Sequence, residues 1–370
     1  MRLALLLSSF NFVFISGFFI GPQFSHFKFS KIILEYERRY EGSSTRSDFD
    51  RELMREALQL ATRAKKRTFP NPAVGCIIFG TARRGVGWHP RAGYPHAEVY
   101  ALADYCGILP VNSRVQDMPE ISSIDASFSA KYKRKGGEMF RDLAKGTTAY
   151  VTLEPCCHSP DSNRSMGEVT KKSTPPCATT LIQAGVSRVV IGCRDPNSHV
   201  NGGGVKLLRA SGITVDWIGG KEEHTARDLI SSFTHRMQAP HPVSMTLNVR
   251  AKLRQIAHKL KVSRQLQDIL LSKVKEKAVS ETWYAEADCK LTSHELLIVK
   301  GVANNSLARV IAQTLRATEI QVIGNTCLLF RPSIAGLKTS GVILNGTSLS
   351  NNSTTASITT TSTTSPPLSI

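Results

Sequence analysis

Short apolar runs alternate with amphipathic stretches between residues 73 and 219, and this alternation narrows the folds open to the chain more than any other feature. Five runs have the length and composition of buried strands: 73–80, 85–89, 149–154, 187–193 and 214–219. Helical periodicity marks the segments 52–67, 96–106, 177–185 and 205–212, of which the last two end in glycine. Strands that alternate with helices predict an α/β fold, with a mixed sheet sandwiched by helices.

The segments outside this alternation differ in composition. Residues 107–145 are polar and have no clear period, so we expect a surface loop inserted between two elements of the sheet. A second insertion is expected at 158–173. Residues 334–370 contain too few apolar side chains to pack and predict a disordered tail rich in serine and threonine. The sheet is therefore expected within residues 49–248, and a second, smaller α/β domain within 249–333.

Basic residues exceed acidic ones in both of these parts, and the formal net charge of the chain is +18. Residues 51–248 hold 26 basic and 17 acidic side chains, and residues 249–333 hold 14 and 7. The smaller part has the greater excess for its size, which indicates an anionic partner such as nucleic acid. A generally basic protein without such a partner is the alternative.

Three short motifs lie where predicted strands end or helices begin. An HAE triplet starts with His96, an EPC triplet ends in Cys156, and a PPC triplet ends in Cys177. These three side chains can supply three of the four ligands of a tetrahedral Zn²⁺, and helix N-termini favour the thiolates that the metal requires. The fourth position is then open to a water nucleophile, and Glu98 is placed to move its proton to a leaving amine. Cys157 is the competing ligand, but the order of proline and cysteine favours Cys156.

The longer motifs around these residues resemble one enzyme family. The order of H-x-E and P-C is typical of zinc nucleobase deaminases. The sequences FPNPAVGCIIF, GWHPRAGYPHAEVYAL, AYVTLEPCCHSP, TPPC and RDPNSHVNGGGVKLLRASGI look like the deaminase half of the bifunctional riboflavin-biosynthesis deaminase/reductase family. This resemblance covers residues from about 50 to 248. It implies a cytidine-deaminase-like fold, a zinc cofactor and the hydrolysis of a diaminopyrimidinone that carries a ribosylamino 5′-phosphate.

The resemblance also implies a set of substrate contacts. They carry over to Asn71, His89, His158, Asp195 and Asn197. Asn71 and Asp195 precede prolines, so both can instead be ordinary turn residues. The family often has a lysine just before TPPC, and this chain has Ser173 there. The phosphate contact is therefore assigned to Lys172 or the neighbouring Lys171, whose ammonium groups can still reach a phosphate.

Two features depart from the family pattern. The chain places 20 residues between Cys156 and Cys177, where the family has a short loop. After HPVSMTLNV the chain differs from the family's reductase domain, so we expect no NADPH-dependent step. The sequence therefore predicts the deaminase activity alone.

Residues 249–333 are similar to a different family. LRQIAHKLK, HELLIVKG and QVIGNTCLLFRPS resemble the CRM domain, a small α/β RNA-binding module of bacterial ribosome assembly and plastid intron splicing. That family binds RNA partly through a glycine-containing loop, and VSRQLQDILLSKVKE has no glycine. The basic residues that could follow phosphates are Lys252, Arg254, Lys259, Lys261 and Arg264. A domain retained for packing or homodimerisation is the alternative.

The first residues predict the destination of the protein. Residues 1–21 have the layout of a signal peptide, and serines and an asparagine interrupt the apolar run, which favours cleavage over a membrane anchor. Residues 22–48 form a transit-like segment with no acidic residue before Glu35, and the two segments together resemble the two-part presequence of plastids with extra membranes. Free thiolates at the metal site fit the plastid stroma better than the secretory pathway, which is the alternative. No stretch after the presequence is expected to span a membrane.

Together these features predict a zinc-dependent hydrolytic deaminase of riboflavin biosynthesis that acts on a free phosphoribosyl pyrimidine. One alternative is an RNA-directed base deaminase steered by the second domain, but such enzymes usually have P-C-x-x-C. The other is an RNA-binding splicing or ribosome-assembly factor with an inactive deaminase half, which the intact metal ligands and Glu98 argue against. We expect residues 71–197 to build the pyrimidine pocket alone, so a chain that ends near residue 248 should keep the activity.

Overall fold

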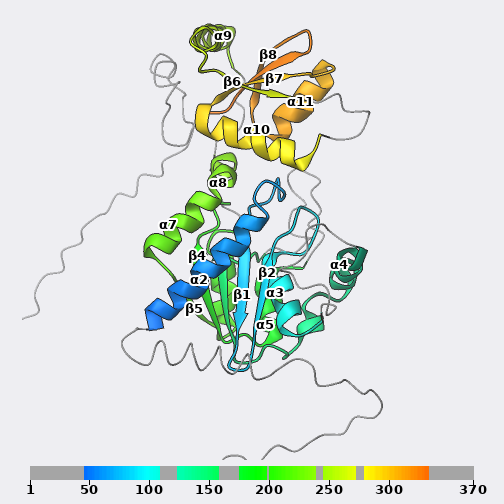
Figure 1. Cartoon of the computed structure of the whole chain (residues 1–370), viewed down its shortest axis with the longest axis vertical. Coiled ribbons are helices and arrows are strands. Elements are labelled where there is room, and N and C mark those ends of the chain that lie inside the picture. Colours follow the sequence, from blue (N-terminus) through cyan, green and yellow to red (C-terminus); the bar gives the residue numbers. More distant parts are fainter. Residues whose placement is uncertain are drawn as a thin grey trace, which may run out of the picture.

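The structure of the chain, a computed structural model, describes residues 46–108, 123–157, 175–197, 200–238, 245–271 and 279–332. They form two units that lie one above the other along the long axis of the molecule (Figure 1). The first unit contains α2 (Arg46–Arg63), β1 (Gly75–Phe79), β2 (Arg84–Trp88), α3 (Ala97–Tyr105), α4 (Ser123–Lys135), η1 (Gly136–Phe140), β3 (Thr148–Leu153), α5 (Cys177–Ala184), β4 (Arg188–Cys193), α6 (Gly203–Ala210), β5 (Thr214–Trp217), α7 (Gly220–Leu229) and α8 (Ser231–Gln238). The second contains α9 (Leu247–Val262), β6 (Gln267–Leu270), α10 (Glu281–His294), β7 (Leu296–Lys300), α11 (Asn305–Thr314), β8 (Thr318–Ile323) and β9 (Thr326–Phe330).

A five-stranded mixed sheet in the order β2-β1-β3-β4-β5 forms the centre of the first unit. β1 is antiparallel to β2 and to β3, whereas β3, β4 and β5 are parallel to one another. Parallel neighbours cannot be joined by a tight turn, and α5 and α6 make the two crossovers. Helices α2 and α7 cover one face of this sheet, and α3, α5 and α6 cover the other.

The helix α2 is anchored to the sheet by an apolar stripe and by one buried ion pair. Leu53, Met54 and Ala57 have no exposed surface and belong to the main core cluster. Near the start of the helix, Asp50 receives two hydrogen bonds from the guanidinium of Arg188, at 2.8 and 2.7 Å. These contacts fix α2, and therefore the loop that follows it, against the sheet.

The second unit is a four-stranded sheet in the order β6-β7-β9-β8, with helices on both faces. The strand β7 shows the alternation that this layering requires, because successive side chains of a strand point to opposite faces. Leu297 and Val299 belong to the cluster formed with α10 and α11, whereas Leu296 and Ile298 pack in the cluster formed with α9. Both faces of the sheet are therefore covered.

The five strands expected in the first unit are all present, within two residues of their predicted ends. The expectation of a surface loop at 107–145 is wrong for part of that range. Residues 123–140 form α4 and η1, and their Phe128, Tyr132 and Phe140 are buried in the main core. The basic side chains of KYKRK masked this apolar spacing, because they occupy the exposed positions of the same helix.

Several sequence expectations fall outside the described residues. These are the signal peptide at 1–21, almost all of the transit-like segment at 22–48, the insertion at 158–173 and the tail at 334–370. Within the ranges that the structure does describe, none of the helices combines the length and the apolar character needed to cross a bilayer.

Candidate metal centre and active site

Segments that carry predicted site residues reach the same edge of the first sheet. Because β1 is antiparallel to both of its neighbours, β2 and β3 run in the same direction. The carboxyl ends of β2, β3 and β4 and the amino end of β1 therefore lie together. The chain at these ends carries Asn71, His89, His96, Cys156 and Asp195.

His96 lies at the N-cap position of α3, which begins at Ala97 and packs along β2. The helix and the strand are in very close contact, since a Cβ atom on Gly87 would lie 2.4 Å from the backbone nitrogen of Ala101. Glycine is required here because any side chain would push α3 away from the sheet. The close packing fixes the start of α3, and with it His96 and Glu98, beside the sheet edge.

The two cysteines meet at the start of α5. Cys156 follows β3, and Cys177 is the first residue of α5, with Pro176 at the N-cap position. The Sγ atom of Cys156 accepts a hydrogen bond from the backbone N–H of Cys177 at 3.3 Å, and its carbonyl oxygen accepts one from Ala178 at 3.1 Å. Both thiols therefore lie at a helix N-terminus, where the backbone dipoles favour negative charge.

The distances between the three side chains suit a tetrahedral metal. The Nδ1 atom of His96 lies 3.5 Å from the Sγ of Cys156 and 3.3 Å from the Sγ of Cys177. A tetrahedral Zn²⁺, with bonds of about 2.3 Å to sulfur and about 2.0 Å to nitrogen, would separate the two kinds of ligand atom by roughly 3.5 Å. The three ligand atoms all lie within 4.8 Å of one another, and the described ranges contain no second group of three potential metal ligands.

Glu98 lies in the first turn of α3 and is 3% exposed. Burial raises the pKa of its carboxyl, and the charge of Cys156 adds to the rise, while His96 and a hydrogen bond with Cys177 act in the opposite direction. A carboxyl whose pKa is moved toward neutrality can both accept and return a proton. The structure therefore places a buried carboxyl with a raised pKa beside the three predicted metal ligands.

His89 and Asn71 form a hydrogen-bonded pair next to the metal ligands. The Nδ1 of His89 lies 3.0 Å from the carbonyl oxygen of Pro95, which only accepts, so Nδ1 carries the hydrogen. The Nε2 then accepts a hydrogen bond from the Nδ2 of Asn71, also at 3.0 Å. Burial, followed by the charge of His96, lowers the pKa of His89 to about 3. The ring is therefore neutral, and it meets the ring of His96 edge-on with centroids 5.2 Å apart.

Asp195 and Asn197 form a turn after β4. The backbone N–H of Asn197 donates to Oδ1 of Asp195 at 2.8 Å, and the carbonyl oxygen of Asn197 accepts from Val200 and Asn201. These hydrogen bonds show that the two residues form a turn, which lies at the same sheet edge as the metal ligands. Their contact with a substrate stays a prediction.

Cys157 packs against the start of α6. A Cβ atom on Gly203 would lie 2.5 Å from the Sγ of Cys157, so this sulfur lies against α6. The same contact region includes Glu154, which accepts hydrogen bonds from the backbone N–H groups of Gly202 and Val205. Cys157 is not part of the group of three ligands, in keeping with the choice of Cys156.

The remaining predicted site residues fall outside the described ranges or lie in the second unit. His158 and Lys172 lie outside the described residues, so their roles stay predictions. The predicted RNA contacts lie in the second unit, on α9 and just after it, and all five side chains are exposed: Lys252, Arg254, Lys259, Lys261 and Arg264.

Tyr132 was missed by the sequence reasoning. It has no exposed surface, and its hydroxyl lies 2.7 Å from the Oγ1 of Thr180 in the first turn of α5. Burial raises the pKa of Tyr132, and the charge of Cys177 adds to the rise. The spacing of Phe128 and Tyr132, four residues apart, was the signal that could have revealed the helix.

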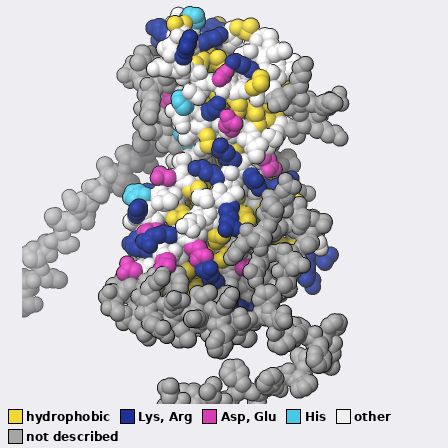
Figure 2. Space-filling view, in the orientation of Figure 1, with side chains coloured by type: hydrophobic (Ala, Val, Ile, Leu, Met, Phe, Trp, Pro, Cys, Tyr) yellow, Lys and Arg dark blue, Asp and Glu magenta, His cyan; other side chains and the backbone are white. Residues whose placement is uncertain are grey.

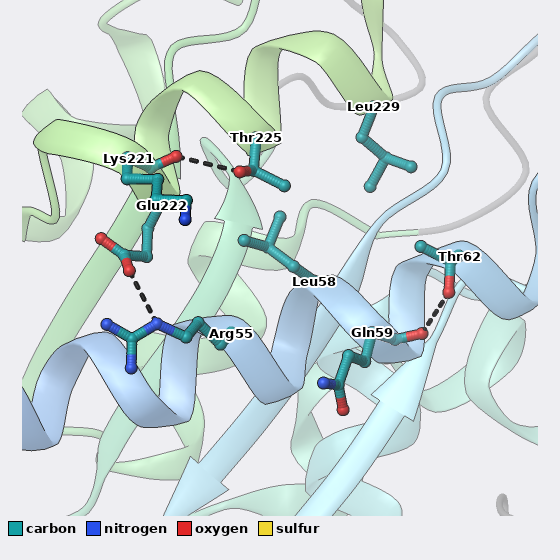
Figure 3. Close-up of a pocket in the computed structure, with 8 residues that line it drawn as sticks. All are labelled: Arg55, Leu58, Gln59, Thr62, Lys221, Glu222, Thr225 and Leu229. Atoms are coloured by element: carbon teal, nitrogen blue, oxygen red, sulfur yellow. Dashed lines mark hydrogen bonds and ion pairs between the residues drawn. The ribbon is translucent and has the colours of Figure 1, made fainter.

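A surface groove lies between α2 and α7 (Figure 3). Its lining residues are Arg55, Leu58, Gln59, Thr62, Lys221, Glu222, Thr225 and Leu229. Burial alone would raise the pKa of Glu222, but hydrogen bonds from Arg51 and Arg55 outweigh it and lower the pKa. The groove is thus bridged by ion pairs that join the two helices, and it contains none of the predicted site residues.

Comparison with known proteins matches the first unit to zinc deaminases. Residues 47–193 match the family described as "Cytidine and deoxycytidylate deaminase zinc-binding region". The chain is 38% identical over 194 residues to "Riboflavin biosynthesis protein RibD" of Escherichia coli (strain K12), which covers 52% of this chain and 40% of that protein. It is 36% identical over 189 residues to "Riboflavin biosynthesis protein PYRD, chloroplastic" of Zea mays, covering 51% of this chain and 36% of that protein.

A shorter relative is matched along most of its length. The chain is 35% identical over 167 residues to "Diaminohydroxyphosphoribosylamino-pyrimidine deaminase" of Buchnera aphidicola subsp. Schizaphis graminum, covering 45% of this chain and 82% of that protein. By contrast, the chain spans about two fifths of the length of the Escherichia coli and Zea mays proteins.

Proposed function

Because the chain belongs to the diaminohydroxyphosphoribosylaminopyrimidine deaminase family, we propose that it is a zinc-dependent hydrolytic deaminase of riboflavin biosynthesis. It would convert 2,5-diamino-6-ribosylamino-4(3H)-pyrimidinone 5′-phosphate to 5-amino-6-(5-phosphoribosylamino)uracil and ammonia. The observation that carries this proposal is the group formed by His96, Cys156 and Cys177 beside the buried Glu98.

The chemistry follows from the positions of these side chains. A zinc ion held by His96, Cys156 and Cys177 would supply Lewis-acid activation of the attacking water. Glu98 would take a proton from that water and deliver it to the departing amine, so that a C–O bond replaces the C–N bond and ammonia leaves. Its buried position, which raises its pKa, favours a carboxyl that changes its protonation state during each turnover.

The pyrimidine would lie against the pair formed by Asn71 and His89. His89 is neutral and its hydrogen is directed to Pro95, so the ring orientation is fixed before a substrate arrives. The hydrogen bond to His89 in turn orients the Asn71 amide, which can both donate to and accept from the edge of a base. We place His158, Asp195 and Asn197 around the remaining pyrimidine and ribose groups, and Lys172 at the phosphate.

The test is product formation by the full zinc-loaded chain from two classes of substrate. The free diaminopyrimidinone phosphate should release one ammonia for each uracil product, whereas single-stranded RNA containing cytidine and adenosine should release none. Deamination of the RNA but not of the free nucleotide would favour an RNA-directed deaminase. No ammonia from either substrate at full zinc occupancy would contradict the proposal and favour an inactive deaminase half.

We infer a second role, RNA binding, for the second unit. Side chains of Lys and Arg gather at the surface over α9 (Figure 2). Lys252 and Lys259 lie two helical turns apart, as do Arg254 and Lys261, and the two pairs flank the buried stripe that contains Leu253. Exposed cations in such rows can follow a phosphate backbone without reading its sequence.

We also propose that the protein acts in the plastid. Relatives from Zea mays and Arabidopsis thaliana, each 36% identical to the chain, are named as chloroplastic. The predicted presequence lies almost entirely outside the described residues, so the proposal rests on these names and on the composition of the first 48 residues. A fluorescent protein fused to residues 1–50 should enter the plastid, and its secretion would contradict the proposal.

A further inference from the structure

The loop between α2 and β1 is held by the second unit, toward which it extends (Figure 1). Phe69 in this loop is 5% exposed and belongs to the apolar core of the second unit. Among the residues that the structure describes, every other buried member of that core comes from position 269 or later. The ring of Phe69 stacks on that of Tyr284 in α10, with centroids 5.3 Å apart and planes inclined by 10°.

Arg236 of α8 ties the same loop to α10. Its guanidinium donates hydrogen bonds to the carbonyl oxygen of Pro70 and to the carboxylate of Asp288. It also lies over the ring of Phe69, 4.6 Å from the centroid. Both members of the ion pair are 3% exposed. A buried charge that loses its partner is strongly unfavourable, so the pair fixes α8, α10 and the loop relative to one another.

The loop continues directly into the proposed substrate pocket. The backbone N–H of Asn71 donates to the carbonyl oxygen of Thr68 at 2.7 Å, so residues 68–71 form a tight turn. At the end of this turn, the side chain of Asn71 bonds to His89, whose ring contacts that of His96. A shift of Phe69 or Pro70 would therefore move Asn71 and its contact with His89.

We propose that the second unit positions the substrate-binding loop of the deaminase, with Arg236, Asp288 and Phe69 as positioning residues. The inference rests on the proposed function, because it assigns Asn71 to the pyrimidine pocket. These residues do not touch the metal ligands in any described contact, so they should govern how well the substrate binds and leave the chemical step nearly unchanged. No sequence motif indicates this coupling, and the motifs predicted a pocket built by residues 71–197 alone.

A purely stabilising contact between the two units is the alternative, and the second unit contains a matched control for it. Arg331 has no exposed surface and donates to the other carboxylate oxygen of Asp288 at 2.7 Å. Its remaining described hydrogen bonds go to Leu315, Thr292 and the backbone of Asp288, all within the second unit. Replacing either arginine removes one of the cations paired with Asp288, but only Arg236 also bonds to Pro70 in the loop between α2 and β1.

The experiment compares R236M, R236K and R331M in the full chain, with zinc content, melting temperature, kcat and KM measured for each. R236M should raise KM for the diaminopyrimidinone phosphate about tenfold, because a tenfold change corresponds to the loss of roughly one hydrogen bond. Its kcat should stay within about twofold, and zinc should be retained. R236K can donate to Pro70 or to Asp288, but its single ammonium lacks the two-pronged guanidinium geometry that reaches both. Its KM should lie between those of R236M and the unchanged protein. R331M should lower the melting temperature and leave KM unchanged.

The variant Y284L provides a second route if R236M fails to fold. It removes the ring that stacks on Phe69 and keeps the ion pair, and it should raise KM about threefold, at the scale of one aromatic pair. Normal KM in R236M, or in Y284L where R236M does not fold, would overturn the positioning role. Equal KM changes in R236M and R331M would also overturn it and favour the stabilising contact. Failure of the unchanged protein to deaminate the substrate at full zinc occupancy would instead contradict the proposed function, and the positioning role with it.

Discussion

The metal cluster and the turn at residues 68–71 lie at the same edge of one sheet, but they are held there in different ways. His96 and Cys177 sit at helix starts and Cys156 follows a strand, so elements of the first unit alone place the three ligands. The turn depends on Arg236, which contacts Pro70 across 166 positions of the chain, and on Asp288 beyond it. The difference teaches that local motifs encode the chemistry of this site, whereas packing between two units shapes its pocket.

The largest effect should follow from removing a metal ligand. C177S replaces a soft thiolate with a hydroxyl that binds zinc poorly, so the variant should lose its zinc and all measurable turnover. C157S is the matched control, because Cys157 contacts Gly203 and lies outside the cluster, and it should keep about one zinc per chain. Metal analysis of the two purified variants checks this, and full zinc in C177S would remove Cys177 from the ligand set.

Removal of the second unit should have the next largest effect. A chain that ends at residue 244 loses α10, which leaves Phe69 uncovered and Arg236 without Asp288. Exposure of one phenylalanine costs about 2 kcal/mol, which corresponds to a melting temperature lower by roughly 5 °C in a chain of this size. KM should rise at least about tenfold for the reason given for Arg236. Thermal unfolding measures the melting temperature, and steady-state kinetics measure KM. If neither changes, the deaminase unit is independent of the second unit, as the sequence predicted.

The comparison also shows which parts of the fold and of the site could be predicted from the sequence. The strands of the first sheet were predictable because each is a short apolar run between turn residues, and the ligands because HAE, EPC and PPC fall at element boundaries. Phe69 lies within one of the family-like motifs, and no local pattern connects it with Tyr284. Arg236 and Asp288 belong to none of the motifs or predicted helices. Their pairing depends on how two units pack, which periodicity and short motifs do not encode.

Acid should weaken the contact between the two units through His235 of α8, which is 5% exposed. Burial, followed by the charge of Arg331, lowers the pKa of His235 from 6.5 to about 4, while Asp288 and Glu295 act in the opposite direction. Because the folded pKa lies below the unfolded one, the unfolded chain binds the proton more readily. Stability that is present above pH 6.5 is therefore lost as the pH falls toward 4.

H235Q should accordingly lose less stability than the unchanged protein between about pH 7 and pH 5. Melting temperatures at a series of pH values measure this effect. H224Q changes an exposed histidine of α7 and should follow the unchanged protein. If H235Q and H224Q show the same dependence on pH, His235 has no part in the acid response.

The smallest effect on deamination should come from the exposed basic residues of α9. The double variant K259E/K261E should keep kcat and KM, because α9 packs against strands of the second sheet. Its RNA affinity should fall. The slope of log affinity against log salt concentration should become shallower by about 0.7 for each phosphate contact that is lost on a single strand. K133E/K135E on α4 is the control for net charge. Equal loss of RNA affinity in both double variants, measured by a filter-binding titration, would indicate non-specific attraction to a basic protein.

The most direct test of the central claim, that the metal cluster and Glu98 form an active deaminase site, is ammonia release from the diaminopyrimidinone phosphate by E98Q. Glutamine keeps the shape of the side chain and removes its ability to carry a proton. At a zinc content equal to that of the unchanged protein, turnover should fall by a factor of ~10² or more, the scale of a lost general acid–base group. Turnover close to that of the unchanged protein would show that Glu98 does not carry the proton, and the account of the site would be wrong.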